Sequence, residues 1–212
     1  MQHLAVSLLA LASTSLAQYT SQSKPFQLVI QSDDGNYDAA NLGACHEGAA
    51  IEGLCVGGGS TFYHNTSENA LVQNESAGEQ GVLTYILRGG NFNSEFDATV
   101  KENLNHRADA LKASEPMELH YYESSNVALP LFEPLDEHTL VAFDKDNKMN
   151  IQAYIDDTVT PPTAGNFRPL YRWYVCQTYY AGYTYTTLAW VMGNAEPQNP
   201  SCKSVQVVRE FI

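Results

Sequence analysis

Short stretches in which apolar and polar residues alternate recur along the whole chain. In the first of them, Pro25 to Gln31, every second residue is Phe, Leu or Ile. A period of two places the apolar side chains on one face of a strand. We therefore expect strands at Pro25 to Gln31, Gly81 to Leu87, Met117 to Tyr122, Val127 to Phe132, Leu140 to Phe143, Met149 to Tyr154 and Ser204 to Phe211.

Two details refine these strands. The turn Asp144 to Lys148 separates two of them and predicts a hairpin. Pro130 lies inside another and predicts an edge or a bend there, because proline cannot donate a ladder hydrogen bond.

The strongest local signal is the stretch from Tyr171 to Trp190, where two runs rich in aromatic residues and threonine flank Ala181-Gly182. A two-residue connection that contains glycine is typical of a β-hairpin, because glycine adopts the positive φ of a tight turn. Counting outward from the turn predicts the pairs Tyr180 with Tyr183, Gln177 with Thr186, Val175 with Leu188 and Trp173 with Trp190.

This register divides the hairpin into two different faces. One face carries both tryptophans, Val175 and Leu188, and it is expected to be core. Tyrosine rings stack on sugar faces, and their hydroxyl groups form hydrogen bonds at a wet surface. The other face therefore offers either ordinary packing or a ligand platform, with the candidate binding residues Tyr174, Tyr180, Tyr183 and Tyr185.

One segment departs from the strand pattern. Between Ser94 and Lys112 apolar residues recur at helical spacing, although several asparagines oppose a helix. Short strands separated by turn signals otherwise predict an all-β fold. We expect a single-domain antiparallel β-sandwich or barrel over residues 18–212, with a β-trefoil as the alternative.

Residues 1–17 form a separate segment. The apolar run Leu4 to Ala12 is followed by the small residues Ser15 and Ala17, a pattern typical of a secretory signal peptide. A membrane-spanning helix needs about 20 apolar residues, and neither this run nor any later stretch provides them. We expect a secreted, extracellular protein with no membrane span.

The formal net charge is −13, and none of it lies in the first 17 residues. Such a charge repels a phosphate backbone, so nucleic acid is not an expected partner. Anionic membrane surfaces are disfavoured for the same reason.

Four cysteines follow the signal segment, and four cysteines allow three disulfide connectivities. In a secreted chain an even number of cysteines indicates disulfides. We favour the local pairs because each closes a short loop, which stabilises a fold by roughly 2–4 kcal/mol. These pairs are Cys45 with Cys55 and Cys176 with Cys202.

Asn65-Thr66-Ser67 and Asn74-Glu75-Ser76 are glycosylation acceptor motifs. Both lie between Gly57 and Gln80, a polar segment that we expect to form an exposed surface bearing sugar at Asn65 and Asn74.

The sequence contains no convincing catalytic or metal-binding motif. Asp144 to Asn147 resembles the start of a calcium loop, but Met149 and Ile155 replace its glycine and glutamate. We expect no metal and no cofactor. A glycosidase would need two carboxylates, for which the candidates are Glu133, Asp136 and Glu137, or Asp156 and Asp157, or Asp33 and Asp34.

Two blocks of sequence are more distinctive. They are Asn41-Leu-Gly-Ala-Cys-His-Glu-Gly-Ala-Ala-Ile-Glu-Gly-Leu-Cys55, and Tyr171-Arg-Trp-Tyr-Val-Cys with the later Pro197-Gln-Asn-Pro-Ser-Cys202. In these blocks the chain resembles a family of secreted proteins of filamentous ascomycete fungi that has no assigned activity. The resemblance covers most of the mature chain and implies a fungal, extracellular origin. It carries over no catalytic residue.

These observations favour a secreted, non-catalytic glycoprotein that associates with cell-wall polysaccharide or acts on a host protein. The alternative is a secreted carbohydrate-active hydrolase. A binding protein would expose a shallow strip of aromatic residues, whereas a hydrolase would hold two acids, or an acid and a histidine, in a cleft.

Overall fold

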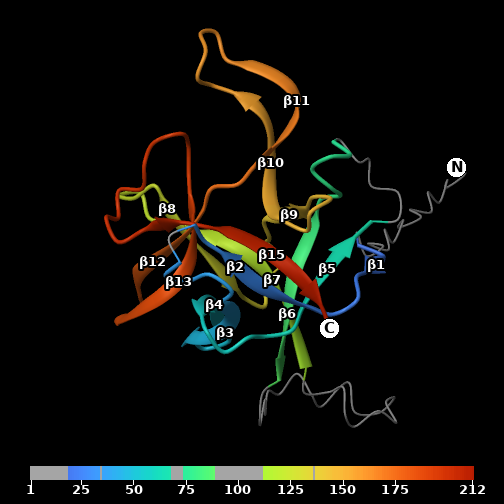
Figure 1. Ribbon diagram of the computed structural model, residues 1–212, viewed down its shortest axis with the longest axis vertical. Coiled ribbons are helices and arrows are strands. Elements are labelled where there is room, and N and C mark those ends of the chain that lie inside the picture. The colour runs from blue at the N-terminus through green and yellow to red at the C-terminus, as the bar shows by residue number, and fades with distance from the viewer. Residues whose placement is uncertain (1–18, 34, 68–73, 89–111, 136) are drawn as a thin grey trace, which may run out of the picture.

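The computed structural model describes residues 19–33, 35–67, 74–88, 112–135 and 137–212. Within these ranges the chain is all-β, and every strand pairing is antiparallel (Figure 1). These ranges contain no helix long and apolar enough to cross a membrane. The strands are β1 (Ser21–Gln22), β2 (Phe26–Gln31), β3 (Asn41–Gly48), β4 (Ile51–Val56), β5 (Phe62–Thr66), β6 (Gly81–Arg88), β7 (Lys112–His120), β8 (Val127–Phe132), β9 (Leu140–Phe143), β10 (Met149–Asp156), β11 (Thr163–Leu170), β12 (Trp173–Tyr180), β13 (Tyr183–Val191), β14 (Lys203–Ser204) and β15 (Gln206–Phe211).

Eight strands close into a barrel. Around the barrel they follow the order β2, β3, β4, β13, β8, β7, β6 and β5, and β5 pairs back to β2 at Phe62 and Phe26. Of the predicted alternatives, the protein therefore adopts the barrel. Closure pairs the edges of these strands with one another, which removes the free edges of an open sheet.

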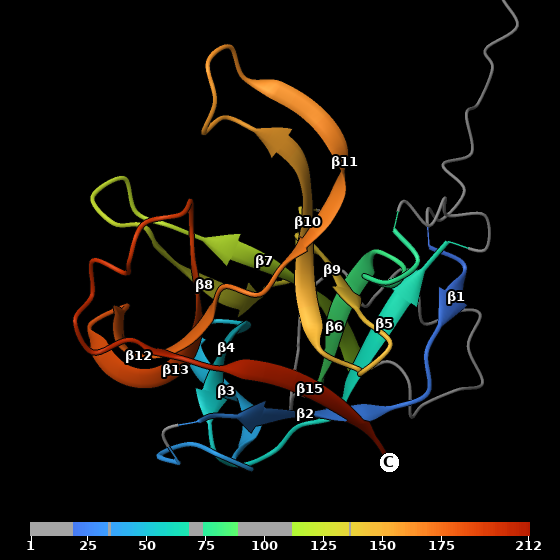
Figure 2. The ribbon, with the colours of Figure 1, turned by 45° about the horizontal axis from the view of Figure 1, so that its top comes forward.

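The remaining strands extend this barrel. Strand β12 pairs with β13 and with β14, and β15 covers the edge of β2 over its whole length. Strands β9, β10 and β11 continue from β6, and Figure 2 shows β10 and β11 projecting from the barrel as a long arm.

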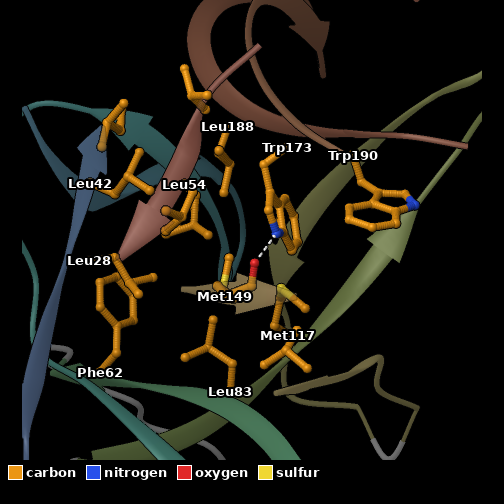
Figure 3. Close-up of a cluster of buried hydrophobic side chains, with 14 of the residues drawn as sticks. Leu28, Leu42, Leu54, Phe62, Leu83, Met117, Met149, Trp173, Leu188 and Trp190 are labelled. Atoms are coloured by element: carbon orange, nitrogen blue, oxygen red, sulfur yellow. Dashed lines mark hydrogen bonds between the residues drawn. The ribbon is translucent and has the colours of Figure 1, made fainter. Parts of the chain in front are cut away.

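The core fills the barrel with large apolar side chains, and Trp173 is completely buried among them. Its indole Nε1 donates a hydrogen bond to the carbonyl oxygen of Met149 at 2.9 Å (Figure 3). Its ring meets that of Trp190 edge to face, with the centroids 4.8 Å apart. The apolar face of the predicted hairpin is thus core, as expected.

All the predicted strands are present, with shifts of a few residues at their ends. Pro130 pairs with Leu119 of β7 on one side and has no strand partner on the other. It lies where β8 exchanges one neighbour for another, because Ala128 pairs with Trp190 of β13 and Leu131 pairs with Gly53 of β4. A residue without an N–H group is tolerated at such a gap in the ladder.

Two expectations need correction. The segment from Gly57 to Gln80 is not simply an exposed surface, because β5 forms part of the barrel wall with Phe62 and His64 buried. Strands β1, β3, β4, β5 and β11 were also not predicted, since polar residues, and glycines in β3, β4 and β11, break the alternation. The predicted helix and the signal segment fall outside the described residues, except for Lys112, which begins β7.

We predict that Trp173→Phe will lower the free energy of unfolding by roughly 2–4 kcal/mol. The change leaves a cavity and an unpaired buried carbonyl group at Met149. Urea unfolding followed by circular dichroism measures this change in the free energy of unfolding. The control is Trp190→Phe, which removes similar ring volume but leaves this hydrogen bond intact. Equal losses in the two variants would contradict a role for the hydrogen bond.

Candidate functional site

The β12–β13 hairpin has the register predicted from its turn. Tyr180 pairs with Tyr183 and Thr178 pairs with Tyr185, so Tyr180, Tyr183 and Tyr185 share one face near the turn. We call these three residues the tyrosine tip. Tyr174 lies about 20 Å away along the strand, half-buried against the cluster around Cys176. The structure therefore brings together three of the four candidate tyrosines.

The tyrosine tip stands away from the barrel wall because β13 loses its neighbours. Strand β13 pairs with β4 at Thr187 and with β8 at Trp190 and Val191. On the edge of β8, β4 replaces β13 in the direction of the hairpin turn, because Leu131 and Phe132 pair with Gly53 and Glu52. The end of the hairpin therefore leaves the sheet and lies outside the wall.

An aromatic strip surrounds the tyrosine tip. Tyr183 has 69% of its surface exposed, and its ring lies 6.5 Å from that of Tyr185. On the other strand, the ring of Tyr180 meets His120 edge to face at 5.7 Å, and His120 meets the exposed Tyr122 at 5.1 Å. These rings come from two separate parts of the chain and lie close together, and partly exposed aromatic rings of this kind are suited to ligand binding.

Glu47 lies against the barrel wall beneath this strip. It is 3% exposed, and its Oε2 accepts no hydrogen bond from the described residues. Gly53 makes this position possible, since a side chain there would collide with the Glu47 carboxylate. Burial, and secondarily the charge of Glu52, raises the pKa of Glu47 to about 7.

Acidic groups also influence the tyrosine tip. Partial burial, followed by the charges of Glu133, Tyr122 and Glu47, raises the pKa of Tyr180. Desolvation, followed by Glu47, raises the pKa of Tyr185. The Tyr185 hydroxyl also donates to the carbonyl oxygen of His46 at 3.4 Å, which connects the tip to the end of β3. The aromatic strip and these two carboxylates therefore form one site.

Two further carboxylates, Glu52 and Glu115, point into the barrel. Each lies two residues before a core residue of its strand, Leu54 or Met117, and therefore shares the inward face. Glu52 lies 3.3 Å from Nδ1 of the exposed His46. Glu115 is completely buried, and neither of its oxygens accepts a hydrogen bond from the described residues. Burial, together with neighbouring carboxylates, raises the pKa of Glu115 to about 7.

Only Glu133 of the acids singled out in the sequence lies at this site. Asp156 caps the end of the arm by accepting from Thr158, and Asp34 and Asp136 lie outside the described residues. Glu47, Glu52 and Glu115 were missed, because a sequence does not show which acids are buried. The signal that could have indicated them is the position of each glutamate inside a β-strand.

A separate cleft of about 690 Å³ lies beside the β9–β10 turn. Asp144 accepts hydrogen bonds there from the amides of Asp146 and Lys148 and from the Tyr171 hydroxyl, at 2.9, 2.9 and 2.7 Å. Burial and this hydrogen bond raise the pKa of Tyr171 to about 12. The carboxylate of Asp144 is thus engaged in holding the predicted turn.

Both predicted disulfides are present, Cys45 with Cys55 and Cys176 with Cys202. The two glycosylation acceptors differ in setting. Asn65 lies within β5 of the barrel wall, whereas Asn74 lies in a turn and donates to the carbonyl oxygen of Phe167 at 2.9 Å. Glycosylation of both stays a prediction.

The buried Glu115 predicts a specific dependence of stability on pH. Its pKa is about 7 in the folded protein against 4.5 ordinarily, so its contribution is fully present below pH 4.5 and lost as pH rises through 7. Glu115→Gln should match the native protein in thermal stability at low pH. At about pH 8 it should be more stable by roughly 1–3 kcal/mol.

Thermal unfolding at a series of pH values measures this difference, and titrating groups common to both proteins cancel. Glu210→Gln, at an exposed position of β15, serves as the control, and its thermal stability should differ little from that of the native protein at any pH. If the difference in thermal stability between the native protein and Glu115→Gln were the same at all pH values, it would refute a buried, protonated Glu115.

Comparison with known proteins gives one match. A family model described as a domain of unknown function, DUF7907, matches residues 23–211. No curated protein and no solved structure matches the chain. Since the match spans nearly the whole chain, the protein belongs to the DUF7907 family.

Proposed function

We propose that this protein is a secreted, non-catalytic carbohydrate-binding protein that holds cell-wall polysaccharide on its tyrosine tip. The observation that carries the proposal is the gathering of Tyr180, Tyr183 and Tyr185 on a hairpin end that leaves the barrel wall. Rings presented this way can stack on the apolar faces of sugars, while their hydroxyl groups reach sugar hydroxyls.

Several features support secretion. Two disulfides are compatible with an oxidising, extracellular environment. The pattern of residues 1–17 and the two acceptor motifs agree with this location. The resemblance to secreted fungal proteins makes the fungal wall the nearest polysaccharide.

The placement of the acids favours binding over catalysis. Glu115 has no exposed surface, so a substrate cannot reach it without a rearrangement. Glu52 lies on the inner side of the wall, whereas Glu47 lies on the outer side. Neither Glu52 nor Glu115 can therefore flank one glycosidic bond together with Glu47, which leaves Glu133 as its one candidate partner among the acids discussed.

The proposal predicts that the purified protein will be retained on insoluble chitin, β-glucan or cellulose. The double variant Tyr183→Ala/Tyr185→Ala should bind roughly 5- to 150-fold more weakly, since each aromatic contact contributes roughly 0.5–1.5 kcal/mol. Depletion of protein from solution over each polymer measures the affinity.

Tyr154→Ala provides a matched control, because Tyr154 is an exposed tyrosine on the β10–β11 arm, away from the hairpin. It should bind like the native protein. Equal losses in both variants would place binding elsewhere. Retention on none of the polymers would contradict the proposal and favour a host protein as the partner.

A carbohydrate-active hydrolase is the second candidate function. The observation in its favour is the raised pKa of Glu47, about 7, directly beneath the aromatic strip. A carboxyl group that keeps its proton near neutral pH can serve as a general acid.

Incubation with soluble oligosaccharides distinguishes the two functions. A binding protein should release no new reducing ends. Release by the native protein, with a loss of about a hundredfold or more in Glu47→Gln, would establish the hydrolase instead. Glu210→Gln should leave any activity unchanged, because it lies on β15 outside the site.

A further inference from the structure

We propose that the Cys45–Cys55 disulfide is a site of thiol–disulfide exchange, at which a small external thiol opens the bond and Glu47 protonates the sulfur of Cys45 as it leaves. The reaction is independent of carbohydrate binding. It gives the disulfide a chemical function in addition to joining β3 to β4.

The disulfide lies on the outer side of the barrel wall. Cys45 pairs with Gly53 in the β3–β4 ladder, and Cys55 pairs with Gly43. Successive residues of a strand face opposite sides of the sheet, so Cys55 faces away from the core residue Leu54. Both cysteines are partly exposed. A small thiol can therefore reach the bond from solution.

The carboxyl group of Glu47 lies against this bond. Its Oε1 is 3.8 Å from Sγ of Cys45, and one carboxylate oxygen lies within 4.8 Å of both sulfurs. The space for this side chain exists because position 53 is glycine, where a Cβ atom would collide with the Glu47 carboxylate. The wall is thus shaped to hold an acid in contact with the disulfide.

The surroundings of Glu47 equip it to donate a proton. The residue is 3% exposed, and its Oε2 has no hydrogen-bond partner in the described part of the chain. Such a group is stable in its neutral form, and burial accordingly raises its pKa to about 7. A thiolate that forms beside it would be a new buried charge. Transfer of the unshared proton of Glu47 removes that charge.

The exchange proceeds in two balanced steps. An external thiolate attacks Sγ of Cys55, the electron pair of the S–S bond moves to Sγ of Cys45, and the Glu47 proton neutralises that sulfur. A mixed disulfide remains on Cys55. A second external thiolate attacks the outer sulfur of this mixed disulfide, and Cys55 leaves and takes a proton from water. The two external thiols are oxidised to a disulfide, and the protein cystine is reduced by the same two electrons.

The second disulfide of the protein provides an internal control. Cys176 is 1% exposed and packs in an apolar cluster with Val127, Ala189 and Val191. A thiol cannot reach its sulfur unless this cluster opens. The rate of exchange depends on access to the sulfur that is attacked, so Cys45–Cys55 should react while Cys176–Cys202 stays intact.

Other titratable groups face Glu47 from the neighbouring strands. Glu52 of β4 opposes its ionisation. Tyr185 of β13 and Tyr180 of β12 have pKa values raised above their usual 10, so both stay neutral below pH 8. His46 of β3 lies 3.3 Å from Glu52 and can titrate in the same range as Glu47. His46→Gln therefore serves as a control for the pH dependence.

The test exposes the native protein to dithiothreitol at pH values from about 5.5 to 8. Acid quenching, alkylation and mass spectrometry follow each disulfide, and each rate is divided by the thiolate fraction of the reductant. Cys45–Cys55 should open first. Its rate per thiolate should fall about tenfold over this range, because Glu47 loses its proton near pH 7. His46→Gln should show the same fall.

Glu47→Gln should open about a hundredfold more slowly at pH 5.5 and show no dependence on pH, because an amide cannot supply the proton. A merely structural role of Glu47 predicts the opposite, an equal or faster opening in this variant. Simultaneous opening of both disulfides in the native protein, or a native rate per thiolate that is independent of pH, would overturn the proposal.

A second measurement needs no variant and so does not depend on whether Glu47→Gln folds. Reduced glutathione, added to the native protein and quenched early, should be found attached to Cys55, with Cys45 present as a free thiol. Glu47 contacts the sulfur of Cys45, which makes this sulfur the leaving group. Glutathione attached to Cys45 instead would overturn the role proposed for Glu47.

Discussion

A shared hydrogen-bonding edge of strand β8 is the constraint on which the arrangement of this protein depends. One edge of β8 pairs with β7, and the other pairs with β13 at Val127 and Ala128 but with β4 at Leu131 and Phe132. Two strands cannot occupy the same stretch of one edge. Strand β13 must therefore leave β8 where β4 takes its place, and the hairpin end becomes a separate surface. The position of the tyrosine tip follows directly from barrel closure.

The same closure determines the electrostatic character of the site. It buries Glu47 against a glycine on the outer side of the wall and seals Glu115 inside, where neither oxygen has a partner among the described residues. A carboxyl group in such a place resists ionisation. The protein thus holds Glu47, a buried carboxyl group with a raised pKa, close to the tyrosine tip.

Local patterns predicted much of the fold. The turn at Ala181-Gly182 predicted the register of the β12–β13 hairpin, and the short spacings of the cysteines favoured the two disulfides that the structure contains. The barrel strands β3, β4 and β5 escaped prediction because polar residues, and glycines in β3 and β4, disrupt the alternation. Gly53 illustrates the reason. Its sequence context predicts neither a turn nor a strand, and its role is to leave space for the Glu47 side chain.

By itself, the sequence determined the features that depend on neighbours along the chain. These are the all-β class, the faces of the hairpin, and the tyrosines available at its end. Only the tertiary structure decided which of these tyrosines meet acids, and which acids are buried. Glu47, Glu133 and Tyr180 are far apart in sequence, and they interact because the barrel brings their strands together. Burial and charge coupling are properties of distance in space, and no local pattern in the sequence records them.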